Sequence, residues 1–478
     1  MTSTVLDDGS EQGSVPTPTG MPDGWRSRIG NRRWPCASAF LMMVTGLLFM
    51  VLWFPVVHHQ QTWYVGADLW GMVRGAHYVG WGFLGGIYVP SNGIITFPGL
   101  PVLLAPAAIL SGGLHLSESY SPIFLAHPTA ALILQPIELL LASSVVFASD
   151  ALAEHLEVSR KRRACLCIVI AVVAWPTAAL WGHAEDALAM SFALYGLIAC
   201  LDKKWAKCGW LLGLGIVVQP LVALLLPLLI ASIPRARRFM IIIRSLTASG
   251  LLIGVAIAGN ATDTLRALLQ QPTPPSVNHA TPWVALSPQL NRAPEPVSHV
   301  SAALPRSIPS LLDAVTTTGR EVIVVAGGAG RILDVAFAVL LGLYVWRRPQ
   351  PAIRLVWLAA VVLASRCFFE PVMTPYYLAP PLFLCLVLAA RQRGKRFWPA
   401  SIIALEITVF AYHHLNPWLW WLPVVAGLGA IVALGYPGGI KAETESPEDS
   451  FIVAEESDGD PALEQIPVVA PVRAPAFL

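Results

Sequence analysis

The first strongly apolar stretch of the chain reads WPCASAFLMMVTGLLFMVLWFPVV and runs from Trp34 to Val57. It carries no charged residue and is long enough to cross the hydrocarbon core of a bilayer as one helix. The basic residues Arg26, Arg28, Arg32 and Arg33 precede it, and basic residues mark the cytoplasmic end of a membrane helix. No small-residue cleavage site follows a short apolar core, so we interpret the stretch as an uncleaved signal-anchor.

The composition of the whole chain agrees with a membrane protein. Of 478 residues, 55% are hydrophobic and only 13% are charged, and the mean hydropathy is +0.62. The charged fraction is about half that of ordinary soluble domains. A formal net charge of +2 leaves no large basic surface for nucleic acid. These values exclude a soluble globular enzyme, a disordered protein and a nucleic-acid binder, and they predict an all-α, polytopic transmembrane helical bundle.

The remaining basic clusters predict the topology, because such clusters stay in the cytoplasm. They are Arg160–Arg163, Lys203/Lys204/Lys207, Arg235/Arg237/Arg238, Arg347/Arg348 and Arg391/Arg393/Lys395/Arg396. With all of them inside, the predicted spans are 34–57, 128–150, 164–181, 187–202, 239–259, 327–346, 352–369, 374–390, 397–413 and 418–436.

Two further apolar segments do not fit as single crossings. Residues 94–114 contain three prolines, and residues 206–233 are interrupted at Gln219-Pro220 and again at Pro227. A single crossing at either place would put a basic cluster outside, whereas a re-entrant hairpin keeps every cluster inside. Irregular backbone at membrane depth needs surrounding protein or a water-filled cavity. Ordinary spans kinked by proline are the alternative, so the count is about 10–12 spans.

This topology divides the chain into three parts. Residues 1–33 are expected to form a disordered cytoplasmic N-terminus, 34–436 the transmembrane domain, and 437–478 a disordered, acidic cytoplasmic tail. The transmembrane domain includes two long extracytoplasmic loops, 58–93 and 260–326.

The loop 58–93 holds a single acid, Asp68, between aromatic residues, with Arg74 and His77 close behind. Trp and Tyr are common at membrane interfaces. One interpretation is therefore an interfacial helix with one solvated charge, and the other is a functional acid.

The turn 182–186 places His183, Glu185 and Asp186 between two apolar runs. Acids in the first turn of a helix favour its N-terminal dipole, which is one explanation for them. The other is a site for a cation, a sugar hydroxyl or a metal, because charges embedded in a membrane protein tend to mark function.

The turn 366–377 places Arg366 and Glu370 at the outer ends of two spans. They either pair with each other, or Arg366 holds a phosphate, whose oxygens suit the planar guanidinium. Within the second long loop, Thr281–Leu286 is apolar and is expected to dock as a lid.

Over roughly residues 35–436 the chain resembles the GT-C superfamily of integral membrane glycosyltransferases, in particular the actinobacterial branch that uses polyprenyl-phosphate sugars. The resemblance rests on an acid in the first outer loop and on several short motifs. These are Asp68, Gly182-His183, Lys203-Lys204, Gly209–Ile216, Gln219-Pro220, and Arg366 with Glu370, Tyr376 and Tyr377. Many members have two acids in the first loop where this chain has one, and Gln219 stands where a lysine is usual.

The resemblance implies a GT-C-like fold and a hexosyl or pentosyl transferase in the cell membrane. The donor would be a polyprenyl-phosphate sugar, mannose-like, and the acceptor a lipid-linked or envelope glycan on the extracytoplasmic face. Asp68 would be the catalytic base. Phosphate would be held by Arg366, Arg74 and His183, and sugar hydroxyls or a divalent cation by Glu185 and Asp186. His77, Glu370, Tyr376 and Tyr377 are further candidate substrate-binding residues.

Two other classes of function stay open: a transporter or flippase, and a non-catalytic membrane protein of envelope assembly. Broken helices are also a transporter feature, but transporters usually have two similar halves, and no repeat is found here. Polar turns that meet around one outer pocket would favour the enzyme, and acids paired deep in the bilayer would favour transport.

Overall fold

The computed structural model describes residues 32–57, 62–118, 127–273, 278–290, 323–392, 395–413 and 415–438, so almost all of both predicted tails lies outside it. The described part is mainly helical. Seven of its helices are long and apolar enough to cross a membrane, so the chain is a multi-pass membrane protein. They are α2 (Arg33–Val57), α5 (Ala131–His155), α6 (Arg160–Ala179), α10 (Arg235–Gly259), α13 (Ala329–Arg347), α14 (Ala352–Phe369) and α17 (Pro417–Gly435).

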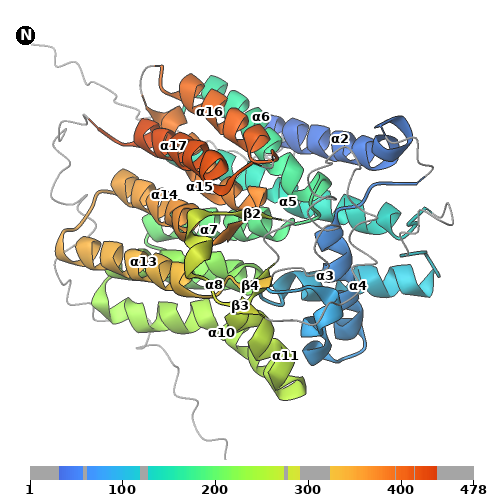
Figure 1. The fold of residues 1–478 in the computed structure, drawn as a ribbon. Helices are drawn as coiled ribbons and strands as arrows, with labels where there is room; N and C mark the ends of the chain where they lie inside the picture. Colours follow the sequence, from blue (N-terminus) through green and yellow to red (C-terminus); the bar gives the residue numbers. More distant parts are fainter. Residues whose placement is uncertain are drawn as a thin grey trace, which may run out of the picture.

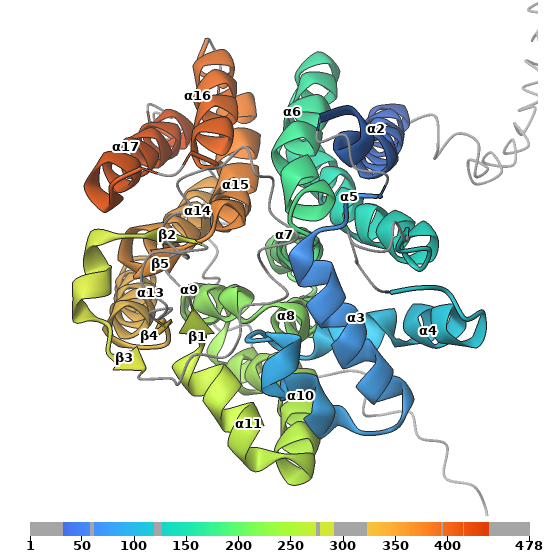
Figure 2. The ribbon, with the colours of Figure 1, turned by 45° about the vertical axis from the view of Figure 1, so that its right-hand side comes forward.

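Three predicted spans are shorter helices: α7 (Glu185–Leu201), α15 (Ala379–Arg391) and α16 (Phe397–Phe410). At 1.5 Å per residue the 13 residues of α15 reach about 20 Å, less than the ~30 Å hydrocarbon core. The shortness of α15 follows from a proline, because Pro375 begins the 3₁₀ turn η6 (Pro375–Leu378) and the α-helix starts only after it. Nearly every residue of α7 and α15 is buried, and α7 lies at the centre of the molecule in Figure 2.

The outer helices expose large apolar side chains, as expected for a lipid-facing surface. Examples are Phe40 on α2, Phe239 on α10 and Ile332 on α13, each about 70% exposed. The long helices run alongside one another in Figure 1, with α2 packed against α5 and α6.

The interrupted segment 206–233 forms two short arms. The helix α8 (Trp205–Val218) stops where Gln219 adopts an extended conformation, and η3 (Pro220–Leu225) and α9 (Leu226–Ser232) follow. Gly209 packs on Ile241 and Gly213 on Ser245, so α8 and α10 run in the same direction. The chain must therefore reverse between them, as a re-entrant hairpin does.

The segment 94–114 contributes the helix α4 (Gly99–Gly113), which lies against α3 (Ala67–Gly80) toward the right of Figure 1. Between these helices come the 3₁₀ turns η1 (Leu84–Tyr88) and η2 (Pro90–Asn92). The buried Thr96 hydroxyl donates to the Gln219 side-chain oxygen at 3.0 Å, so this segment is anchored at the break of α8.

The second long loop begins with α11 (Ala261–Leu265) and the π-helical turn η4 (Arg266–Gln270). It adds short strands: β1 (Pro272–Thr273), β4 (Ile323–Val325) and β3 (Gln289–Leu290) form one antiparallel sheet, in that order. A second pair joins β2 (His279–Ala280) to β5 (Val372–Met373), which follows α14. The loop is thereby fastened to the turn 366–377.

Candidate functional site

The segment between α2 and α3, with the start of α3, docks directly onto the turn between α6 and α7. The Asp68 amide donates to the Trp181 carbonyl at 3.2 Å, and the Tyr64 hydroxyl donates to the Leu180 carbonyl at 2.6 Å. Gly66 and Gly182 allow this contact. A Cβ atom on Gly66 would lie 2.3 Å from the Gly182 nitrogen, and Gly182 has a positive φ of 70°. Residues more than a hundred positions apart thus meet backbone to backbone.

This docking brings Asp68 to His183. The Asp68 Oδ2 atom lies 3.4 Å from His183 Nδ1, and Glu185 Oε1 lies 2.9 Å from the same nitrogen. On the other edge of the ring, Nε2 lies 3.4 Å from Asp186 Oδ2. The Asp68 side chain is 35% exposed, whereas those of Glu185 and Asp186 are fully buried. Asp68 is therefore the most exposed of these three acids.

The His183 ring is charged in this arrangement. Carboxylates face both nitrogens, and a neutral imidazole would direct a lone pair at one of them. Burial lowers the pKa of His183, but Glu185, Asp186 and Asp68 more than offset this and raise its pKa well above the ordinary value. The site therefore contains an imidazolium clamped between acids from α3 and α7.

A fourth carboxylate comes from α5, and the sequence did not single it out. Glu138 Oε1 accepts from the Ala184 amide at 3.0 Å and so caps the start of α7. Its other oxygen, Oε2, is buried and has no hydrogen-bond partner in the described part of the chain. The sequence signal that could have identified Glu138 is its position, because it is an acid inside an otherwise apolar span, two residues after Pro136.

Aromatic rings form one wall of this cluster. Tyr376 stacks on the His183 ring with the centroids 3.8 Å apart, and Trp181 contacts both Tyr376 and Tyr412. Such a wall offers flat apolar faces and hydroxyl groups beside the charged centre.

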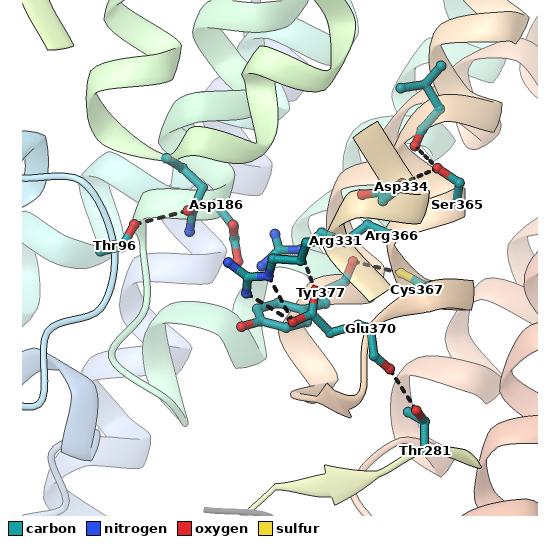
Figure 3. A network of polar contacts seen from close by, with 12 residues as sticks. Thr96, Asp186, Thr281, Arg331, Asp334, Ser365, Arg366, Cys367, Glu370 and Tyr377 are labelled. Carbon is teal, nitrogen blue, oxygen red and sulfur yellow. Dashed lines mark hydrogen bonds and ion pairs between the residues drawn. The ribbon is translucent and has the colours of Figure 1, made fainter. Parts of the chain in front are cut away.

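Beyond the tyrosines lies a pair of arginines (Figure 3). Arg331 Nη2 donates to Glu370 Oε1 at 2.9 Å, while Arg366 Nε lies 3.5 Å from Glu370 Oε2. The Arg366 guanidinium also rests 3.8 Å over the Tyr377 ring, and its Nη1 atom is buried without a hydrogen-bond partner among the described residues. Two cations share one carboxylate, which leaves positive charge and an unused donor for an anion.

Arg331 is a site residue that the sequence patterns did not single out, and it directly follows the glycine-rich run 327–330. Its position was nevertheless a signal. It lies in the first turn of α13, where the helix dipole disfavours a cation. The predicted topology also places this end of the span outside, where arginine is uncommon.

The expected lid segment docks on the same turn. The Thr281 amide donates to the Pro371 carbonyl at 3.0 Å, and its hydroxyl donates to the Glu370 carbonyl at 2.7 Å. The 3₁₀ turn η5 (Pro282–Leu286) follows and places Trp283 against Phe368 and Phe369. The segment thereby covers the turn that carries Glu370.

Arg74 and His77 lie elsewhere. In a helix, residues six apart point about 120° away from each other, and residues nine apart lie ~13 Å along the axis on the opposite face. Arg74 is accordingly exposed on α3, and His77 Nε2 lies 2.5 Å from Glu118 Oε1. The structure thus brings Asp68, His183, Glu185, Asp186 and Tyr376 together beside Arg366, but not the other two.

Within the described ranges, no group of three or more His, Cys, Asp or Glu side chains is arranged to hold a metal ion. The carboxylates surround an imidazole rather than a common point. No protein-family model matches this sequence, and no curated protein matches it significantly. The geometry of the site must carry the functional argument by itself.

Proposed function

We propose that the protein is a membrane glycosyltransferase of GT-C type that moves a sugar, mannose-like, from a polyprenyl-phosphate donor to a lipid-linked or envelope glycan acceptor. The reaction takes place on the extracytoplasmic face of the cell membrane, with both termini in the cytoplasm. The observation that carries the proposal is the contact between Asp68 and His183, because it joins the acid of the first loop to the turn before α7.

Asp68 is the base that takes the proton from the acceptor hydroxyl. It is the most exposed acid of the cluster, and its Oδ2 atom lies 3.4 Å from His183 Nδ1. A base in this role must reach the hydroxyl within hydrogen-bond distance, and a half-exposed carboxylate at a helix start can do so.

Arg366 stabilises the leaving phosphate. Its unpartnered Nη1 offers a hydrogen-bond donor. Glu370 also pairs with Arg331, so its single negative charge does not neutralise both guanidinium groups. Donors that are fixed before the reaction stabilise charge that develops on a leaving group. Glu185 and Asp186 hold sugar hydroxyls, and the tyrosine wall packs on the sugar ring.

The single acid of the first loop is compatible with this proposal. Where many similar enzymes have a second acid in that loop, here Glu185 and Asp186 supply carboxylates from the next turn in space. The second acid is provided by the fold instead of by the loop.

The test is sugar transfer by the purified protein in lipid nanodiscs with a short-chain polyprenyl-phosphate sugar donor. Asp68→Asn keeps the size of the side chain and the fold but removes the base, and we expect turnover to fall at least 100-fold. Asp263→Asn, an acid of the same outer face 25% exposed on α11, is the matched control and should retain activity. Normal transfer by Asp68→Asn would reject Asp68 as the base.

A further inference from the structure

The charges of the site are separated into two ends. Three carboxylates, from Asp68, Glu185 and Asp186, contact the imidazole of His183, and a fourth, from Glu138, accepts from the neighbouring Ala184 amide. Two arginines share Glu370 at the other end. Tyr376 and Tyr377 join the two ends. Their rings meet edge to face with centroids 5.2 Å apart, Tyr376 packs on His183, and Tyr377 lies under Arg366.

The acidic end holds four carboxyl groups for one imidazole. Glu138, Glu185 and Asp186 are at most 1% exposed, so water does not screen them. Charge buried in this way must be paired or must take up protons. Glu138 Oε2, Asp186 Oδ1 and the Gln135 side-chain oxygen are buried acceptors without a hydrogen-bond partner in the described part of the chain.

These unused acceptors call for donors, and the arrangement does not provide metal coordination. A protonated amine supplies three hydrogen-bond donors and one positive charge in a compact group. A protonated amine would also compensate the charge of a bound phosphate. The site has more acidic than basic side chains, so a donor phosphate alone would add further negative charge to it.

We propose that the site binds a ligand that joins a phosphate to a protonated amine, with the phosphate at Arg366 and Arg331 and the ammonium among the carboxylates. This inference rests on the proposed function and narrows its substrate class to a lipid-phosphate amino sugar. The same chemistry is present in a phosphoethanolamine lipid headgroup. Figure 3 shows Asp186 beside the arginine cluster, and its charge acts on Arg366, so the two ends belong to one site.

The experiment measures binding by calorimetry to the full-length protein in nanodiscs free of ethanolamine lipids. Three short polyprenyl-phosphate ligands are compared that differ only at one carbon of the sugar: glucosamine, N-acetylglucosamine and glucose. We expect the free amine to bind at least tenfold more tightly than either neutral sugar. Glu138→Gln keeps the oxygen that caps α7 but removes the charge, and it should reduce that preference to less than threefold.

Asp186→Asn is the second charge-removing variant, in case Glu138→Gln does not fold, and Asp263→Asn is the control that should keep the preference. Equal affinity for the amine and the neutral sugars overturns the inference, because protons then balance the acids. Competition by phosphatidylethanolamine as strong as that of the glucosamine ligand would support the site and assign it to a headgroup.

The outcomes for the inference and for the transferase proposal are separable. Transfer of glucose and glucosamine at equal rates, without an amine preference in binding, would support the enzyme and reject the inference. Preferential binding of the amine ligand without any sugar transfer would support the inference and reject the transferase proposal.

Discussion

Gly66→Ala is the sharpest test of how the site is assembled. The added Cβ would lie 2.3 Å from both the Gly182 nitrogen and the Trp181 carbonyl carbon, and these are backbone atoms that cannot rotate away. Ordinary contacts between such atoms are about 3.5 Å, so the two segments must separate by about 1 Å. That shift is enough to break the Asp68–Trp181 hydrogen bond, which is 3.2 Å long.

The same shift moves Asp68 away from His183. Their 3.4 Å contact would pass the ~4 Å limit of an ion pair. We expect sugar transfer to fall by about 100-fold, as for other 1 Å displacements of catalytic groups. Crowding should also lower the free energy of unfolding by about 1–3 kcal/mol.

The assay combines turnover in nanodiscs with thermal unfolding in detergent. Gly113→Ala is the matched control, because a Cβ there meets no atom within 4 Å. It should leave both values unchanged. Wild-type turnover and wild-type melting temperature in Gly66→Ala would refute the docking of the first loop and, with it, the role of Asp68.

Two further predictions concern stability. Asp150, 2% exposed, accepts two hydrogen bonds from Arg163 and also pairs with Arg32. Asp150→Asn should cost about 1–3 kcal/mol, because it removes a buried carboxylate from these pairs while Glu154 still pairs with both arginines. Thermal unfolding measures this, and an effect no larger than that of Asp263→Asn would contradict it. The ion pairs of His183 contribute while its imidazole is protonated. Because its pKa is raised, their stabilisation is complete below about pH 6.5 and is lost as the pH rises through the raised value. The melting temperature of the wild type should therefore fall more steeply between pH 7 and 10 than that of His183→Gln, and parallel curves would disprove the coupling.

Hydropathy predicts the helices of this chain well, because a bilayer imposes one length and one polarity on every span. The run 352–369 matches α14 at both ends, and 34–57 matches α2 to within one residue. Hydropathy predicts less well where prolines divide a helix. The run 374–390 became η6 followed by the 13 residues of α15, because Pro375 begins a 3₁₀ turn.

The site follows a different rule. Sequence reasoning found Asp68, His183 and Arg366 separately, since each is a charged residue at the outer end of an apolar run. It did not show that they meet, because their approach depends on the contact between Gly66 and Gly182. No local pattern distinguishes Gly66 from other glycines, and the Gly182-His183 motif does not reveal which segment packs on it.

Glu138 and Arg331 could not be recognised as site residues from their own segments alone. An acid in a span or an arginine beside glycines has ordinary local explanations. Each nevertheless violates a rule of membrane helices: Glu138 is a charge inside a span, and Arg331 is a cation at an outer helix start. In the fold both face the polar turns, Glu138 through the Ala184 amide and Arg331 through Glu370. A charged residue that is unfavourable in its own membrane helix indicates a partner on another helix. In a membrane protein, such residues are therefore the strongest sequence guide to which distant turns meet in the fold.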